Sequence, residues 1–393
     1  KLMNLILFDG VEADQLLPLT FTRPVSEIRV GILTIREKWE RLLETKAKFL
    51  TKSYLSKKFP LKIAGDNLLV NGSVCPSLSL MSKIIDLKSG EGLYQGDTLI
   101  ACNLADADVP DYDEKVKVKI QFEGKFTHID KLWKIFLSNE RELDADFTLL
   151  ADGRTSQNIS SSNTLIGDQI FVEEGAEIEG AILNAKTGPI YVGKNAKILE
   201  GAMIRNGLAL CESSVIKMGA KIYGATTVGP HSKVGGEVSN SVLFGYSNKG
   251  HDGYLGNAVL GEWCNLGADT NNSNLKNNYD QVKLWNYQRG GFERTGETFI
   301  GLIMGDHSKC GINTMFNTGT VVGVSANIFG AGFPRNFIPS FSWGGPQGYS
   351  VYQLNKAFKT AEIVYGRRGL ELNEIEQGIL EEVFKRTEEY RNF

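Results

Sequence analysis

The densest group of polar residues lies between residues 248 and 274. It reads Asn-Lys-Gly-His-Asp-Gly-Tyr-Leu-Gly-Asn from 248 to 257 and Asn-Leu-Gly-Ala-Asp-Thr-Asn-Asn-Ser-Asn from 265 to 274. Glycines flank His251 and can expose its imidazole, which in its neutral form accepts a proton from an amine or hydroxyl near pH 7. The asparagines suit sugar hydroxyls or a pantetheine amide. The residues alone leave a second interpretation open, in which the asparagines are corner residues and His251 is an ordinary surface residue.

A six-residue apolar repeat forms the frame that would position these polar residues. An α-helix has a period of about 3.6 residues and a strand has a period of 2, so neither explains the spacing. The spacing is typical of a left-handed parallel β-helix, in which each coil has three flat faces and each face turns one side chain inward. The repeat consists of Val192, Ile198, Ile204, Leu210, Ile216, Ile222, Val228 and Val234.

The same spacing occurs before and after this central stretch. It starts at Ile166 after the polar linker 152–164, loses its phase after Val234, and leaves residues 271–297 as an excursion from the coils. It returns as Met304, Cys310, Phe316, Val322 and Ile328. Residues 355–393 predict a helix with Asn373 and Glu376 as a capping pair and with Ile375, Ile379 and Val383 as one apolar stripe.

The first 150 residues have a different pattern, that of an α/β domain. Residues 5–8 and 98–102 are short apolar runs that predict buried strands, and residues 31–43 predict a helix with Ile32, Ile35 and Trp39 on one face. Alternating strands and helices predict a parallel sheet of Rossmann-like type. We therefore predict three regions: an α/β domain over 1–155, a left-handed parallel β-helix over 156–350 and a helical tail over 351–393.

Composition narrows the function classes. The 393 residues carry a net charge of -3 without a long basic run, which argues against nucleic-acid binding. No apolar stretch reaches the roughly 20 residues of a membrane span. The odd count of five cysteines, without a CxxC spacing, predicts reduced and mostly buried thiols in a cytoplasmic protein.

The pattern from His251 to Asn274 resembles the acetyltransferase half of the bifunctional GlmU family, which acetylates glucosamine 1-phosphate and makes UDP-N-acetylglucosamine. That family has His-Leu-x-Tyr-x-Gly-Asp followed by Asn-x-Gly-Ala-Gly-Thr and Asn-Tyr, with the same spacing as here. The resemblance covers about residues 165–335 and implies that His251 is the catalytic base. It also implies that Tyr254 and Asn265 hold the sugar phosphate and that the acetyl-CoA contacts are Ala268, Asn274, Asn313 and Gly330.

The chain differs from the family at the residues that bind the phosphate of the sugar. The family's arginine falls at Tyr223, and a family lysine has no clear counterpart, so Lys249 and Lys283 are candidate substitutes for binding the substrate. A coenzyme-binding serine falls at Ile312, and Asp269 replaces a glycine. These departures leave the identity of the sugar open.

The N-terminal region resembles the sugar-1-phosphate nucleotidyltransferases of the same family more weakly. Its Pro-Leu-Thr-x-Thr-Arg-Pro core is present at 18–24, but most glycines of the phosphate loop are missing. The resemblance implies Mg2+ and UTP or dTTP as ligands, with a weak metal candidate at Asp106. The residues that it implies for nucleotide binding are Asp9, Gly10, Thr20, Arg23 and Asn103.

The leading hypothesis is thus an acetyl-CoA-dependent N-acetyltransferase fused to a nucleotidyltransferase-like domain, a homotrimer of nucleotide-sugar biosynthesis for the cell envelope. The alternative is a sugar-1-phosphate nucleotidyltransferase alone, with a structural or regulatory β-helix. A non-enzymatic assembly protein is a third possibility. A metal site formed by His231, His251 and His307 between subunits is a fourth.

Overall fold

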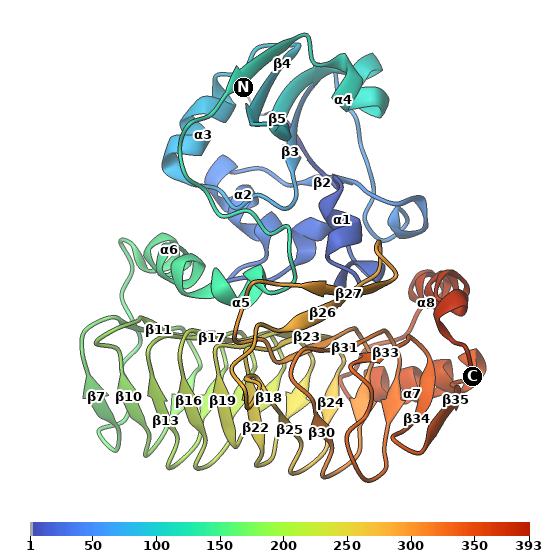
Figure 1. Ribbon diagram of the computed structural model, residues 1–393. Coiled ribbons are helices and arrows are strands. Elements are labelled where there is room, and N and C mark those ends of the chain that lie inside the picture. Colours follow the sequence, from blue (N-terminus) through green and yellow to red (C-terminus); the bar gives the residue numbers. More distant parts are fainter. Residues whose placement is uncertain (1–2) are drawn as a thin grey trace. The chain divides into compact units, whose positions relative to one another are not determined.

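The computed structural model describes residues 3–393, and it confirms the predicted order of an α/β region, a parallel β-helix and C-terminal helices (Figure 1). Contacts divide the chain into two compact units. Unit 1 comprises residues up to Leu16, Thr22–Ile28 and Leu33–Lys131, and unit 2 comprises Leu17–Phe21, Arg29–Ile32 and Leu132–Phe393. Within residues 3–393, no helix has the length and apolar character needed to cross a membrane.

Unit 1 contains a mixed sheet rather than the fully parallel one that the sequence predicted. In the described residues its strand order is β2-β1-β3-β5-β4-β6. β1 is parallel to β2 and β3, whereas β5 is antiparallel to both β3 and β4. The strands are β1 (Asn4–Phe8), β2 (Lys48–Leu50), β3 (Asp66–Asn71), β4 (Glu91–Gln95), β5 (Thr98–Ala105) and β6 (Val118–Gln121).

The reversal of β5 comes from a tight hairpin. Only Gly96 and Asp97 separate β4 from β5, and Gly96 has a φ of 59°. Glycine adopts this left-handed conformation without steric cost, which two-residue hairpin turns require. The direction of β5 decides which end of the sheet its polar residues reach.

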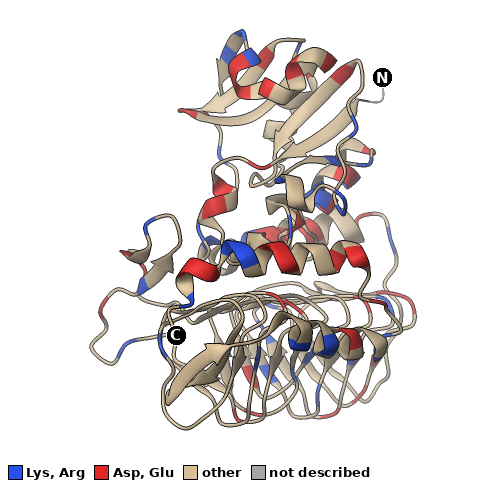
Figure 2. Cartoon of the chain, turned by 90° about the vertical axis from the view of Figure 1, so that its right-hand side faces the viewer, with Lys and Arg blue, Asp and Glu red and all other residues tan. Residues whose placement is uncertain are grey.

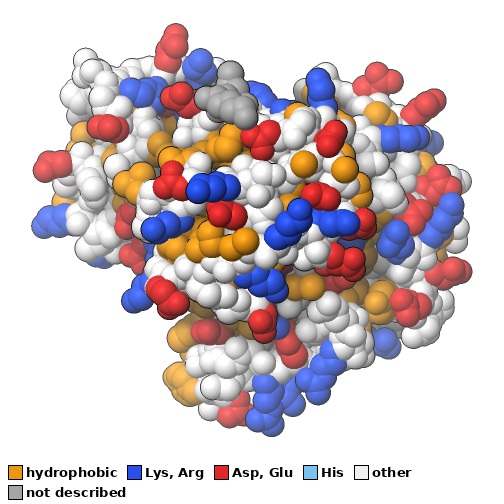
Figure 3. All heavy atoms as spheres, turned by 90° about the horizontal axis from the view of Figure 1, so that it is seen from above, with side chains coloured by type: hydrophobic (Ala, Val, Ile, Leu, Met, Phe, Trp, Pro, Cys, Tyr) orange, Lys and Arg blue, Asp and Glu red, His pale blue; other side chains and the backbone are white. Residues whose placement is uncertain are grey.

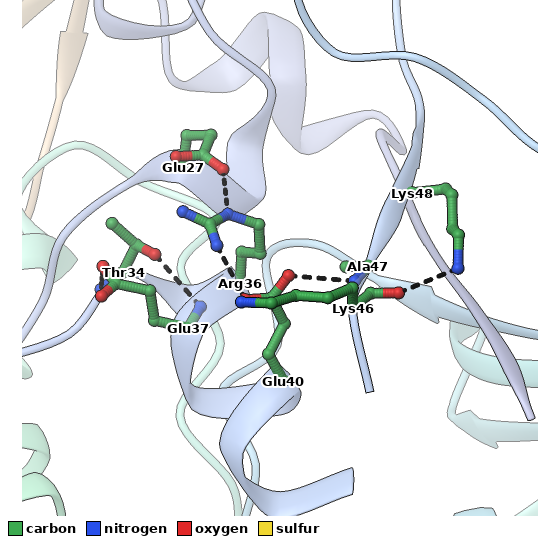
Figure 4. Close-up of polar contacts among 8 residues, drawn as sticks. All are labelled: Glu27, Thr34, Arg36, Glu37, Glu40, Lys46, Ala47 and Lys48. Atoms are coloured by element: carbon green, nitrogen blue, oxygen red, sulfur yellow. Dashed lines mark hydrogen bonds and ion pairs between the residues drawn. The ribbon is translucent and has the colours of Figure 1, made fainter. Parts of the chain in front are cut away.

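The helices of unit 1 are shorter than the sequence predicted, and α2 (Ile35–Leu43) shows why. The predicted helix from residue 31 begins four residues later, because Thr34 and Glu37 form a capping box (Figure 4). In the same turn, Arg36 contacts Glu27 and lies 2.8 Å from Glu40. The other helices are α1 (Glu12–Gln15), α3 (Leu78–Ile85) and α4 (Tyr112–Lys115).

Unit 2 is built on a three-sided parallel solenoid. Face 1 consists of β7 (Thr164–Ile166), β10 (Ile182–Asn184), β13 (Met203–Arg205), β16 (Lys221–Tyr223), β19 (Glu237–Ser239) and β22 (Tyr254–Gly256), and β25 (Asn271–Asn272) pairs with β30 (Met315–Phe316) beyond it. Face 2 consists of β8 (Ile170–Val172), β11 (Ile190–Val192), β14 (Leu208–Leu210), β17 (Thr226–Val228), β20 (Val242–Gly245), β23 (Val259–Glu262), β28 (Leu302–Met304), β31 (Thr320–Val322) and β33 (Phe337–Ile338).

Face 3 completes the prism. Its strands are β9 (Glu177–Ile178), β12 (Lys197–Ile198), β15 (Val215–Ile216), β18 (Lys233–Val234), β21 (Asn248–Lys249), β24 (Asn265–Leu266), β29 (Lys309–Cys310), β32 (Asn327–Ile328), β34 (Ser342–Gly345) and β35 (Gly348–Val351). All eight residues of the central repeat are at most 2 % exposed and belong to one continuous core, so the predicted inward positions are confirmed.

The excursion between the coils is an antiparallel hairpin of β26 (Lys283–Asn286) and β27 (Gly291–Arg294). Its Trp285 stacks on Phe337 of β33, with ring centroids 3.9 Å apart, so the hairpin packs beside face 2. The tail forms α7 (Leu354–Gly366) and α8 (Glu374–Arg386), and Asn373 caps α8 as predicted. The predicted stripe on α8 is incomplete because Ile375 is exposed, whereas Ile379 and Val383 are buried.

Two short segments outside the coils also belong to unit 2. α6 (Asn139–Ala151) lies against face 2, where the Asn139 side-chain amide donates to Thr227 at 3.0 Å, and α5 (Lys134–Leu137) packs against α6. The Gly31 amide donates to Asn139 Oδ1 at 2.6 Å, and a side chain at Gly31 would collide with the backbone of Glu142. The first solenoid strand is β7, which starts at Thr164, but the unit that contains the solenoid also includes α5 and α6.

The surface mixes both signs of charge. The solenoid coils are mostly uncharged, whereas many acidic and basic residues lie on the helices (Figure 2). Acidic and basic side chains are interspersed over the face in Figure 3, with small hydrophobic areas between them. All five cysteines are free and buried, in agreement with the sequence prediction.

Candidate functional site

His251 lies on an exposed corner of the solenoid. β21 of face 3 ends at Lys249 and β22 of face 1 begins at Tyr254, so residues 250–253 connect these faces. Gly253 has a φ of 123°, which residues with a side chain rarely adopt. The imidazole therefore projects from a sharp turn whose backbone the flanking glycines permit.

A cavity of about 410 Å³ lies beside this histidine. Two amide side chains contribute to its wall, those of Asn248 and Asn265, which are neighbours in register on β21 and β24. The ammonium-bearing side chains of Lys217 and Lys233 also line it. The cavity thus combines a proton acceptor, neutral hydrogen-bonding groups and positive charge, which together suit an anionic, hydroxyl-rich substrate.

A polar network extends from the corner over face 1. The Tyr254 hydroxyl lies 2.9 Å from Ser239 Oγ and accepts a hydrogen bond of 2.9 Å from the Asn274 amide. The same amide donates to Asn257 Oδ1 at 2.9 Å. Tyr254 and Asn274, for which the sequence implied different ligands, are therefore direct neighbours.

The other predicted coenzyme residues lie on one edge of the prism. Ala268 follows β24, Asn313 follows β29 and Gly330 follows β32, so each occupies the corner between faces 3 and 1 on successive coils. The backbone N–H of Asn313 donates to the Ala268 carbonyl at 2.8 Å, which links two of these corners directly. His251 lies on the same edge, one coil before Ala268.

Three predicted substrate residues do not line the cavity beside His251. Lys249 is 2 % exposed, and it occupies an inward position of the prism because it pairs in register with the buried Val234. Lys283 lies on the β26–β27 hairpin beside face 2, away from the corner that carries His251. Tyr223 lies on face 1, where its hydroxyl donates to Glu237 at 2.6 Å; burial and this contact raise the pKa of Tyr223 to about 12.

Sequence reasoning missed Lys217 and Lys233, the two lysines that line the cavity. The signal was present in the repeat, because Lys217 follows the inward Ile216 and Lys233 precedes the inward Val234. Both must therefore face outward on face 3, and Lys233 pairs in register with Asn248. A register argument, rather than a motif comparison, would have identified them.

Unit 1 has its own polar edge, at the carboxyl ends of the parallel strands, where ligands of α/β sheets bind. Asp9 follows β1, and its two carboxylate oxygens accept hydrogen bonds from the Val25 amide at 2.9 Å and from the Thr51 hydroxyl at 2.6 Å. Burial raises the pKa of Asp9 to about 6 despite these bonds. Asn71 ends β3 at the same edge, opposite Phe8 in register.

Glu12 brings a second carboxylate to this edge. It is 3 % exposed, and its Oε1 lies 2.9 Å from His128 Nε2 and 3.2 Å from Asn71 Nδ2. Burial opposes ionisation, but the bonds and charge of His128 and Asn71 hold the pKa of Glu12 below its ordinary value. The edge therefore carries its own negative charge where the family resemblance implied nucleotide phosphates.

The remaining residues that were predicted to bind nucleotide or metal in the N-terminal region do not lie together in one site. Asn103 pairs with Leu68 in the middle of antiparallel β5, and its amide donates to Leu87. Asp106 follows β5, so it lies at the opposite end of the sheet from Asp9. Arg23 is buried in unit 1, whereas Thr20 belongs to unit 2.

The structure does not bring these positions together, so the weak metal candidate Asp106 stays a prediction. Mg2+ needs several oxygen ligands around one point, and Asp9, Asn103 and Asp106 are spread along the sheet. No group of three His, Cys, Asp or Glu side chains within residues 3–393 could hold a metal ion. His231, His251 and His307 likewise form no such group within one chain.

Comparisons with known proteins match the first 155 residues to a family model and part of the chain to bifunctional relatives. Residues 5–155 match a family model described as sugar nucleotidyl transferase. A protein of Sulfurisphaera tokodaii, named bifunctional sugar-1-phosphate nucleotidylyltransferase/acetyltransferase, is 31% identical over 219 residues, which cover 55% of this chain and 48% of the relative. The bifunctional protein GlmU of Methanocaldococcus jannaschii is 29% identical over 211 residues, covering 54% of this chain and 45% of the relative.

The chain spans about half the length of the curated relatives that it matches. A crystal structure of the polySia-specific acetyltransferase NeuO covers 48% of this chain and 81% of its own, at 13% identity and a TM-score of 0.26, which is too low to support an argument. The sequence matches are independent of that structure. They show that parts of the chain are similar to sugar nucleotidyl transferases and to GlmU-type bifunctional proteins.

Proposed function

We propose that this protein is a transferase that moves the acetyl group of acetyl-CoA to the amine of an amino-sugar 1-phosphate, of the glucosamine-1-phosphate type. The observation that carries the proposal is the cavity beside His251, because it combines a base, two amides and two lysines. The names of the two relatives, which include acetyltransferase and GlmU, support the same reaction class.

The chemistry follows from the groups at the corner. The sugar amine attacks the thioester carbonyl, a C–N bond forms, the C–S bond breaks and coenzyme A leaves as the thiol. His251 accepts the proton that the amine loses. Backbone N–H groups at the corner stabilise the oxyanion of the tetrahedral intermediate. Lys217 and Lys233 offset the charge of the sugar phosphate, since charge-assisted hydrogen bonds are the stronger ones.

The edge after His251 suits an extended coenzyme arm. Ala268, Asn313 and Gly330 lie on successive coils, and neighbouring strands are about 4.8 Å apart. These corners therefore span roughly 10 Å along the prism axis. A pantetheine chain that runs along this edge would place its thioester next to His251, one coil before Ala268.

A second function, nucleotidyl transfer to a sugar phosphate in unit 1, is favoured by the family match over 5–155. The carboxylates of Asp9 and Glu12 argue against it, because both are at the edge where a triphosphate would bind. A thermal shift of the full chain with UTP or dTTP, with and without Mg2+, tests it. The homotrimer, the cytoplasmic location and a role in nucleotide-sugar synthesis remain predictions.

The acetyltransferase proposal is tested by thiol release from acetyl-CoA with a panel of amino-sugar 1-phosphates. Release that depends on one of these sugars supports it and names the acceptor. Acetyl-CoA alone and the same sugars without phosphate are the controls. If none of the sugar phosphates increases the rate above that of acetyl-CoA alone, the proposal is wrong.

A further inference from the structure

One position in the core of the solenoid carries a lysine. The inward residues of face 3 are stacked in register from coil to coil, and Lys249 follows Val234 in this column. Its neighbour on the next coil is Leu266, since Asn248 pairs with Asn265. The full column is Ile178, Ile198, Ile216, Val234, Lys249, Leu266, Cys310, Ile328 and Gly344.

A lysine at this position is costly for folding. The side chain is 2 % exposed, and an ammonium without water around it must find hydrogen-bond acceptors or lose its proton. An aliphatic residue would fill the column without this penalty, as on the neighbouring coils. The hydrogen bonds of the ammonium group must therefore offset part of the free-energy cost of burying it.

Lys249 Nζ donates hydrogen bonds to two backbone carbonyls, one of them at the corner that carries His251. It donates to the His251 oxygen at 2.7 Å and to the Gly235 oxygen of the preceding coil at 2.9 Å. The next two carbonyls after His251 are held by backbone amides instead: Asp269 donates to Asp252 at 2.9 Å, and Glu237 donates to Gly253 at 3.2 Å. At the His251 carbonyl, the ammonium group of Lys249 thus is the donor, whereas a backbone N–H group of a neighbouring coil is the donor at the next two carbonyls.

The length of this coil explains why a side chain is needed. Eighteen positions separate Ile216 from its partner Val234, but only fifteen separate Val234 from Lys249. The shortened coil leaves the His251 peptide between Gly250 and Gly253, and glycines give a backbone the greatest conformational freedom. Without an internal anchor, the exposed histidine would be held by a flexible turn.

We propose that Lys249 is a positioning residue, whose ammonium group fixes the His251 peptide from inside the prism so that the imidazole faces the cavity. The inference rests on the proposed function of His251 and replaces the expected contact of Lys249 with substrate. Two charged groups act on the lysine, Asp252 from the same corner and Glu237 from β19. Both favour its proton, but burial prevails and lowers the pKa of Lys249 to about 8.

The test compares Lys249→Met, which keeps a long side chain but removes the donors, with Ile216→Met, a matched change two coils away in the same column. Thiol release from acetyl-CoA is measured with the best amino-sugar 1-phosphate. We expect Lys249→Met to lower kcat about 10–100-fold, because small misplacements of a catalytic group have effects of this size. The KM for acetyl-CoA should change little, and Ile216→Met should behave like the wild type.

A second readout does not depend on activity. The chain has four histidines, so ring-labelled protein gives a simple NMR spectrum in which His251→Ala assigns the His251 signal. In the wild type and in Ile216→Met, this signal should show an inflection near pH 8, where Lys249 loses its proton. The inflection should be absent in Lys249→Met.

The two readouts separate the possible failures. Unchanged kcat together with an unchanged His251 titration in Lys249→Met overturns the positioning role. If the wild type acetylates no sugar, the proposed function fails, while the NMR titration still decides whether Lys249 acts on His251. If Lys249→Met does not fold, the wild-type titration alone decides, and the lack of an inflection near pH 8 overturns the proposal.

Discussion

The ammonium group of Lys249 lies 2.7 Å from the carbonyl oxygen of His251, so a lysine in the core of the prism holds the peptide of the proposed base. This arrangement lowers the free energy of unfolding but fixes the position of the His251 peptide. A buried charge lowers the stability of the solenoid, whereas a fixed imidazole serves catalysis. The two effects can be measured separately.

The stability of the protein should increase with pH as Lys249 loses its proton. Its pKa is about 8 in the folded protein and 10.5 as the ordinary value, so the unfolded state binds more protons between these pH values. The penalty is complete below pH 8 and disappears by about pH 10.5, and its full size is about 3 kcal/mol. Denaturant unfolding from pH 7 to 10 should show a smaller slope in Lys249→Met than in the wild type, because burial also lowers the pKa of Lys309 to about 8 and that lysine remains. Parallel curves for the two proteins would contradict it.

Lys217 and Lys233 should recognise the phosphate of the sugar. Replacing either one with methionine should raise the KM for the sugar phosphate about 10-fold, as expected for one charge-assisted hydrogen bond. Lys197→Met is the matched control, because Lys197 is an exposed lysine on the same face two coils from Lys233. An equal loss with the sugar that lacks phosphate would show that these lysines have another role.

The Tyr254 hydroxyl should orient the sugar side of the site. Tyr254→Phe removes its contacts with Ser239 and Asn274, each 2.9 Å long. One such hydrogen bond contributes about 1 kcal/mol, so the KM for the sugar should rise roughly 3–10-fold with a similar kcat. Steady-state kinetics with either substrate varied measures this. A fall in kcat with an unchanged KM would instead place the hydroxyl on the reacting atoms.

Asp9 should make unit 1 sensitive to pH in the opposite direction. Its pKa is raised from 3.8 to about 6, so the folded state binds more protons between these values and stability falls as the pH rises through them. Asp9→Asn keeps the shape of the side chain without this titration. The melting temperature of the variant minus that of the wild type should therefore increase from pH 4 to 6 and stay level above. A constant difference is the result that would disprove the assignment.

The sequence predicted the solenoid well because its core repeats. Each inward position meets the same kind of neighbour on the next coil, so a spacing of six identifies the faces without a structure. The same reasoning failed at Lys249, because a search for aliphatic residues passes over a lysine in a shortened coil. Lys217 and Lys233 were missed for a related reason: they have no motif of their own and gain meaning only from the register of face 3.

Unit 1 was harder to predict because strand direction depends on distant pairing. The buried run at 98–102 is a strand, but its polar neighbours Asn103 and Asp106 point to a site only if that strand is parallel to β1. The Gly96-Asp97 turn before it makes it antiparallel. Glu12 and His128 come together from segments more than 100 residues apart, so no local pattern could reveal their contact.

The central claim is that His251 removes the proton from the attacking amine. The most direct measurement is thiol release from acetyl-CoA by the wild type and by His251→Asn, each with glucosamine 1-phosphate and saturating coenzyme. We predict that the variant keeps its fold and its KM for acetyl-CoA but loses about 10²–10⁴-fold in kcat, the usual contribution of a general base. A variant that releases thiol at the wild-type rate would contradict the account.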